Sequence, residues 1–126
     1  ALRFFWDAVA LFTMFRTRNR DERSDRKLAD DKAMDLLLSC LDTSQLRSAA
    51  DHGSFTVRSS RGRVYEIRMT GITGNVWRHD PLGWVQYCAH LPGTIPYADT
   101  WLAQKLAIET DETGFLRIAY QTGSCR

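Results

Sequence analysis

Residues 54–91 alternate between apolar and polar side chains, and this pattern limits the fold more than any other feature of the sequence. In SFTVRSS, Phe55 and Val57 fall on one side and Arg58 on the other, which is the period of a half-buried strand. Turn residues separate this run from further runs of the same kind, which are GRVYEIRMTG, GNVWRHD and GWVQYCAHL. The pattern predicts a four-stranded antiparallel meander with one apolar face and one polar face.

Helical patterns precede the predicted sheet, and helices are needed to cover its apolar face. Apolar residues recur at helical spacing through residues 28–41; they are Ala29, Ala33, Leu36, Leu37, Cys40 and Leu41. We therefore interpret Cys40 as a buried structural thiol. Asp42 and Gln45 have the spacing of a capping box, which predicts a second short helix that stops at Gly53.

The sequence after the sheet also favours helices. A helix is predicted over residues 97–110, and Thr110 is the expected N-cap of a last short helix. The fold class is therefore α+β: N-terminal helices, a four-stranded antiparallel meander, and C-terminal helices packed on one sheet face. We expect a single domain over residues 28–120, an apolar docking helix and charged linker over residues 1–27, and a frayed tail over residues 121–126.

Composition narrows the classes of partner and compartment. The 126 residues include 17 basic and 15 acidic side chains, for a net charge of +2, which is too near neutral to indicate nucleic-acid binding by itself. The cysteines number 3, which does not suggest a disulfide framework and favours a reducing compartment. No signal-peptide pattern and no membrane-length apolar run is present, so we expect a cytoplasmic protein.

The N-terminal residues predict a helix with a broad apolar band. The band comprises Leu2, Phe4, Phe5, Trp6, Val9, Leu11, Phe12 and Phe15. Such a band needs a cover, which could be the sheet, a second copy of the chain, a larger partner or a membrane surface. Arg16, Arg18 and Arg20 follow it, as in anchors to membranes or anionic partners. Our leading hypothesis is a non-enzymatic structural or adaptor subunit that docks through this helix onto a protein partner or onto itself, with a membrane surface less favoured.

The polar face of the predicted sheet supports an alternative hypothesis. Arginines are interleaved with tryptophans there, and the candidate residues are Arg58, Arg63, Arg68, Trp77, Arg78 and Trp84. Aromatic stacking combined with phosphate neutralisation is how proteins hold single-stranded nucleic acid. We therefore keep a single-stranded nucleic-acid-binding module as the alternative.

Cys88 and His90 form the one close pairing of residues with catalytic or ligating chemistry. A zinc site needs more ligands than these two side chains provide. A thiol nucleophile needs an activated thiolate and an oxyanion hole, and no motif announces either. We therefore expect no metal and no cofactor, and the balance is against an enzyme.

Several segments between Leu36 and Ala119 resemble a group of small, uncharacterised bacterial and phage-type α+β proteins. The resemblance depends on the capped helix LLLSCLDTSQL, the strand segment GRVYEIR, the cysteine of CAH and a P-x-x-D-x-x-L-A-x-K-L helix, here PYADTWLAQKL. No activity is assigned to that group. The resemblance therefore implies a fold and adds no site residue.

Overall fold

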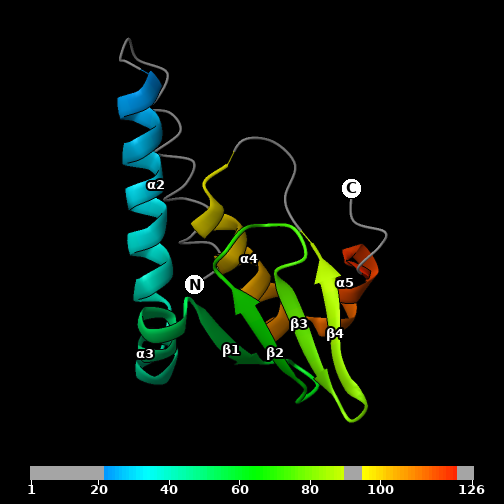
Figure 1. Cartoon of the computed structure of the whole chain (residues 1–126). Coiled ribbons are helices and arrows are strands. Elements are labelled where there is room, and N and C mark those ends of the chain that lie inside the picture. Colours follow the sequence, from blue (N-terminus) through cyan, green and yellow to red (C-terminus); the bar gives the residue numbers. More distant parts are fainter. Residues whose placement is uncertain (1–21, 90–94, 122–126) are drawn as a thin grey trace.

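Antiparallel strands form a 5-stranded sheet whose strands follow one another in chain order (Figure 1). The structure is a computed structural model that describes residues 22–89 and 95–121. The strands are β1 (Ser54–Arg58), β2 (Val64–Arg68), β3 (Val76–Asp80), β4 (Gly83–Cys88) and β5 (Tyr120–Gln121). The predicted four-stranded meander is confirmed, and the two-residue β5 extends it beside β4. A pairing of two residues leaves too short a pattern to be recognised in the sequence.

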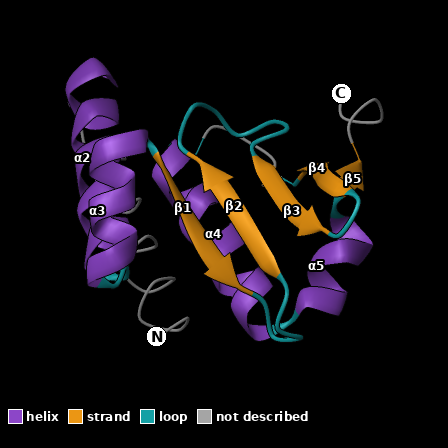
Figure 2. Cartoon of the chain, turned by 60° about the horizontal axis from the view of Figure 1, so that its bottom comes forward, coloured by secondary structure: helices purple, strands orange, loops and turns teal. Residues whose placement is uncertain are grey.

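The helices are α2 (Glu22–Ser39), α3 (Thr43–His52), α4 (Tyr97–Thr110) and α5 (Glu112–Ile118). Helix α4 lies against the sheet and contacts both α5 and α2, while α3 packs against β1 (Figure 2). The face that α4 and α5 cover is called the inner face below, and the opposite face the outer face. In Figure 2, no helix of the described residues lies in front of the outer face.

Alternation along the strands places the apolar core on the inner face. The buried strand residues that point to the inner face are Phe55, Val57, Tyr65, Ile67, Val76 and Tyr87. Leu102 and Ile108 of α4 and Phe115 of α5 meet them, and each is at most 2% exposed. Burial of side chains of this size stabilises the fold by roughly 1.5–3 kcal/mol each.

Helix α4 is buried on most sides because it lies between the sheet and α2. Its polar side chains therefore need partners inside the protein. Gln104 exchanges hydrogen bonds with Asn75 (2.9 and 3.1 Å) and also donates to the carbonyl of Ala89 (2.5 Å). This amide pair fixes the start of β3 against the helix.

Helix α3 protects the free edge of β1. The Gln45 side chain donates to the carbonyl of Thr56 (2.9 Å), and the Ser48 hydroxyl donates to the carbonyl of Ser54 (2.7 Å). These bonds occupy strand carbonyls that would otherwise be open to pairing with another chain. The capping box of Asp42 with Gln45 is confirmed, and Gly53 ends the helix at φ 67°.

Two local expectations differ from the structure. Cys40 is exposed, because α2 ends at Ser39 and a turn carries the chain away before another helical position is reached. Asp111, not Thr110, caps α5 by accepting a hydrogen bond from the backbone N–H of Gly114. Helix α2 is described from Glu22 onward, and so its first described turn lies within the charged segment of residues 1–27. Over the described residues, no helix combines the length and apolar character needed to cross a bilayer.

Candidate functional site

The outer face of the sheet presents a compact group of aromatic and charged side chains. The strand register aligns Glu66 with Trp77 across β2 and β3, and His79 with Trp84 across β3 and β4. Arg68 lies two residues beyond Glu66, and so its side chain is on the same face. We call Arg68, Trp77, His79 and Trp84 the aromatic patch.

Each tryptophan of the patch is paired with a neighbouring side chain. The Arg68 guanidinium lies 4.4 Å from the centroid of the Trp77 ring, in a cation–π contact. The His79 and Trp84 rings lie 4.7 Å apart between centroids and are tilted by 30°. Trp84 is nonetheless 48% exposed, so its side chain is accessible to a ligand. Planar side chains held in this way are suited to stack against another planar group.

Gln86 stands next to Trp77 on the outer face and is held in place by a turn. Its side-chain nitrogen donates to the carbonyl of Gly74 (2.6 Å). Gly74 has φ 62°, and a Cβ at this position would lie 2.7 Å from that same nitrogen. A glycine is therefore needed for the turn and for the close approach of Gln86.

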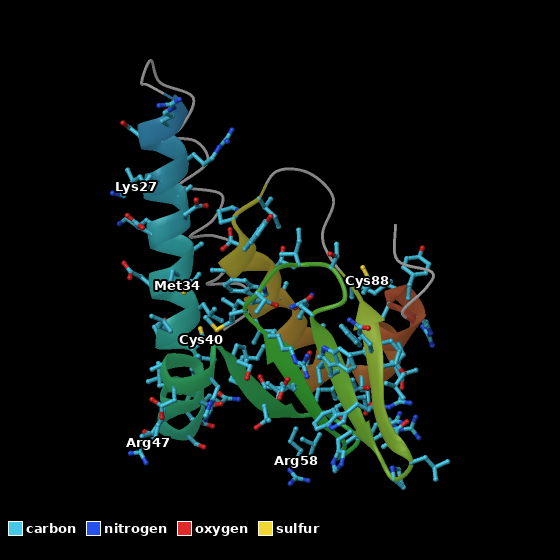
Figure 3. All side chains as sticks on the ribbon, in the orientation of Figure 1. Lys27, Met34, Cys40, Arg47, Arg58 and Cys88 are labelled. Carbon is cyan, nitrogen blue, oxygen red and sulfur yellow. The ribbon has the colours of Figure 1, made fainter. Side chains whose placement is uncertain are left out.

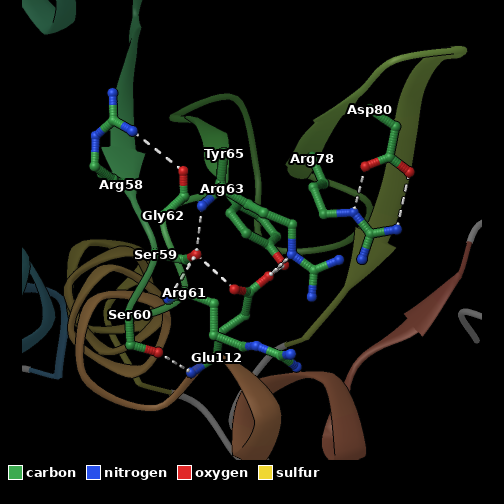
Figure 4. A network of polar contacts seen from close by, with 10 residues as sticks. All are labelled: Arg58, Ser59, Ser60, Arg61, Gly62, Arg63, Tyr65, Arg78, Asp80 and Glu112. Carbon is green, nitrogen blue, oxygen red and sulfur yellow. Dashed lines mark hydrogen bonds and ion pairs between the residues drawn. The ribbon is translucent and has the colours of Figure 1, made fainter.

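The inner face carries a different polar group, centred on the fully buried carboxylate of Glu112 (Figure 4). Ser59 and Tyr65 each donate a hydroxyl to it at 2.5 Å, and the Arg63 guanidinium lies 2.7 Å away. The backbone N–H of Glu112 donates to the hydroxyl of Ser60 (2.9 Å). The carboxylate thus ties the β1–β2 turn to the start of α5, and we call this group the Glu112 network.

The Glu112 network keeps its central carboxylate ionised. Burial disfavours the charged form, but the hydrogen bonds from Ser59 and Tyr65 and the charge of Arg63 outweigh it and lower the pKa of Glu112. Burial and the hydrogen bond to Glu112 raise the pKa of Tyr65 above its ordinary value. Both groups therefore hold fixed protonation states at neutral pH, as expected of a structural network.

Arg78 also faces inward. Its guanidinium donates twice to Asp80, at 2.7 and 2.9 Å, and lies 5.3 Å from the centroid of the Tyr87 ring. The hydrogen bonds to Asp80 raise the pKa of Arg78, against the effect of its burial. With the carboxylate satisfying the guanidinium, Arg78 serves to fill the inner face beside the core.

The structure therefore divides the residues predicted to bind nucleic acid. Arg68, Trp77 and Trp84 lie together on the outer face, and Arg58 lies exposed on the same face at the end of β1, where it donates to the carbonyl of Gly62 (Figure 3). Arg63 and Arg78 lie in the two polar groups of the inner side.

Sequence reasoning missed several residues of these sites. His79 could have been found, because it is two residues from Trp77 and must share its face. Glu66 could have been found in the same way from Arg68. Glu112 gave no signal, because its partners Ser59 and Tyr65 lie 53 and 47 positions away in the sequence.

A further buried carboxylate lies on α4. Asp99 is 5% exposed, and its Oδ1 atom lacks a hydrogen-bond partner. Burial, together with the nearby charge of Asp30, raises the pKa of Asp99 to about 6. The charges of Asp30 and Asp99 repel each other where α2 packs on α4, so the charged form of Asp99 destabilises the fold.

The remaining predicted sites are only partly covered by the structure. The docking residues from Leu2 to Phe15 lie outside the described residues, as does His90. Cys88 is disulfide-bonded, which leaves no free thiol for the hypothetical nucleophile. Within the described ranges, no group of three or more acidic, histidine or cysteine side chains could hold a metal ion.

Comparison with protein-family models, with curated proteins and with solved structures finds no match to this chain. The resemblance to small bacterial and phage-type proteins therefore stays an expectation.

Proposed function

We propose that this chain is a non-enzymatic binding module that recognises single-stranded nucleic acid through the aromatic patch. The observation that supports it most is the half-exposed Trp84, which stacks on His79 on a face that no described helix covers. Bases of a single strand are unstacked and can lie flat on such a ring. Arg68 and Arg58 stand on the same face as donors for phosphate oxygens.

The charges on the outer face determine what kind of binding to expect. Arg58 and Arg68 are its exposed guanidinium groups, and Glu66 partly offsets them. Arg63 and Arg78 are occupied by Glu112 and Asp80. Stacking, at roughly 1–3 kcal/mol per base, would therefore supply more of the affinity than phosphate contacts.

The test is a fluorescence-anisotropy titration of a labelled oligothymidylate with the full chain over a series of salt concentrations. Two phosphate contacts predict a slope of log K against log salt of about −1.4 for a single strand. Arg58→Ala and Arg68→Ala should each reduce the slope by about half, whereas Arg78→Ala should leave it unchanged. Absence of binding at low salt, or equal effects of all three variants, would reject the proposal.

The second candidate function is an adaptor that docks through its apolar N-terminal helix onto a protein partner or a second copy. The broad band from Leu2 to Phe15 favours it, since such a band is unstable when it is left in water. Burial of each large side chain in an interface would contribute roughly 1.5–3 kcal/mol.

Light scattering on a sizing column tests this second candidate with the full chain and a version lacking residues 1–20. A defined oligomer that becomes a monomer on truncation supports docking between copies. A monomer in both cases excludes self-docking. Oligothymidylate binding by the truncated chain separates the two candidates, because the aromatic patch should keep its affinity without the helix.

A further inference from the structure

The two tryptophans of the aromatic patch differ in accessibility. Trp84 is 48% exposed, whereas Trp77 is only partly exposed, and its ring lies 4.4 Å below the Arg68 guanidinium. The indole nitrogen of Trp77 is buried and has no hydrogen-bond partner. The Trp84 ring is therefore open to a ligand, and the Trp77 ring is covered by Arg68.

Glu66 holds the Arg68 guanidinium in place over the Trp77 ring. It neighbours Arg68 on the outer face of β2 and forms an ion pair with the Nε atom of that arginine. The register sets Glu66 directly opposite Trp77, so Arg68 is a diagonal neighbour of the indole. Diagonal neighbours lie roughly 7–8 Å apart, within reach of a long side chain.

We propose that Arg68 is a lid over Trp77, latched by Glu66, and that a single strand of at least two nucleotides displaces it. This inference rests on the proposed function of the aromatic patch. The first base stacks on Trp84, and a phosphate takes the place of the Glu66 carboxylate at the guanidinium. The second base then stacks on the uncovered Trp77, which a mononucleotide cannot do.

The chemistry of the guanidinium makes this exchange feasible. Carboxylate and phosphate oxygens offer it the same charge-assisted hydrogen bonds, so one partner replaces the other without an unpaired charge. The Arg68–Glu66 pair is solvent-exposed, with side-chain exposures of 45% and 23%, and exposed pairs are weakly held. The latch is therefore weak enough for a ligand to open.

The first experiment measures oligothymidylate affinity by anisotropy for the wild type, Glu66→Gln and the charge-matched control Asp35→Asn on α2. Opening the latch should tighten binding by roughly two- to five-fold in Glu66→Gln, as expected for loss of an exposed ion pair. The Asp35 variant should change little. The gain should vanish in a Trp77→Leu background, because there is no platform left to uncover. A gain that persists there would be a simple charge effect and would overturn the lid.

The second experiment follows Arg68 by NMR, because its protons should be shifted upfield by the Trp77 ring in the free protein. Saturation with oligothymidylate should remove that shift, thymidine monophosphate should not, and Glu66→Gln should reduce it without ligand. If the strand binds while the Arg68 shift persists, the lid is wrong and the binding module stands. If no strand binds, the proposed function fails, and the free-protein shift in Glu66→Gln still decides whether the latch exists.

Discussion

The two faces of the sheet use the same residue types for different purposes. On the inner side, Arg63 and Arg78 are paired with Glu112 and Asp80, at 2.7 Å in both cases, and lie beside the core. On the outer face, Arg68 rests on an indole ring, and its side chain is 45% exposed, whereas that of Arg78 is 14% exposed. An arginine beside an aromatic ring therefore indicates a binding surface only when its ion pair with a carboxylate is weak enough for a ligand to replace that carboxylate.

The largest expected effect is a difference in stability between a variant of the inner side and a variant of the outer face. Glu112→Ala should lower the free energy of unfolding by about 3 kcal/mol, because it leaves a guanidinium and two hydroxyls without their acceptor. Glu66→Ala on the outer face should change it by less than about 1 kcal/mol, since an exposed pair contributes little. Urea denaturation of both variants measures the difference. Equal losses of unfolding free energy in the two variants would contradict this difference between the faces.

The next effect concerns Trp84. Trp84→Ala should weaken oligothymidylate binding by about 1–3 kcal/mol, because it removes the open stacking platform. Its effect on stability should be smaller than that of Tyr87→Ala, since Tyr87 is 5% exposed on the inner face and Trp84 is 48% exposed on the outer face. Anisotropy and urea denaturation on the same samples provide both values. Unchanged affinity in a folded Trp84 variant would remove the patch as the recognition surface.

The smallest effect contrasts the satisfied carboxylate of Glu112 with the unsatisfied one of Asp99. The pKa of Asp99 is raised to about 6, so the unfolded chain releases this proton first and stability falls as pH rises from about 4 to about 6. The lowered pKa of Glu112 acts in the opposite sense: its contribution is present above the unfolded carboxyl pKa and is lost as pH falls through the folded value.

Asp99→Asn should therefore stabilise the protein at pH 7 by roughly 1–2 kcal/mol and flatten the stability profile between about pH 4 and 6. Thermal unfolding across that range measures the profile, with Asp35→Asn as an exposed control on α2. A profile that Asp99→Asn leaves unchanged would show that Asp30 and burial do not disfavour the charged carboxylate.

Much of the fold could be predicted because its signals are local. The alternation of Phe55 and Val57 with polar neighbours identified β1, and the spacing of Asp42 and Gln45 identified the start of α3. Cys40 was misplaced because helical periodicity does not record where a helix ends. Its position fits the apolar stripe, but the chain has already turned.

The candidate site was less predictable because it depends on strand parity and on contacts between distant residues. Trp77 and Arg78 are adjacent in sequence, so they must lie on opposite faces of β3, and a list of nearby arginines and tryptophans ignores this. Arg63 and Arg78 are held in ion pairs, and so they are not available to a ligand in the way that the sequence list implied. Glu112 lies on a helix far along the chain, and local patterns cannot reveal such a contact.

The most direct test of the account is a chemical-shift titration of the ¹⁵N-labelled full chain with unlabelled oligothymidylate at low salt. We predict the largest changes at the indole N–H groups of Trp77 and Trp84 and at the amides of Arg68 and His79, with α4 unaffected. A spectrum that does not change, or changes centred on α4 and α5, would contradict the assignment of the outer face as a nucleic-acid-binding surface.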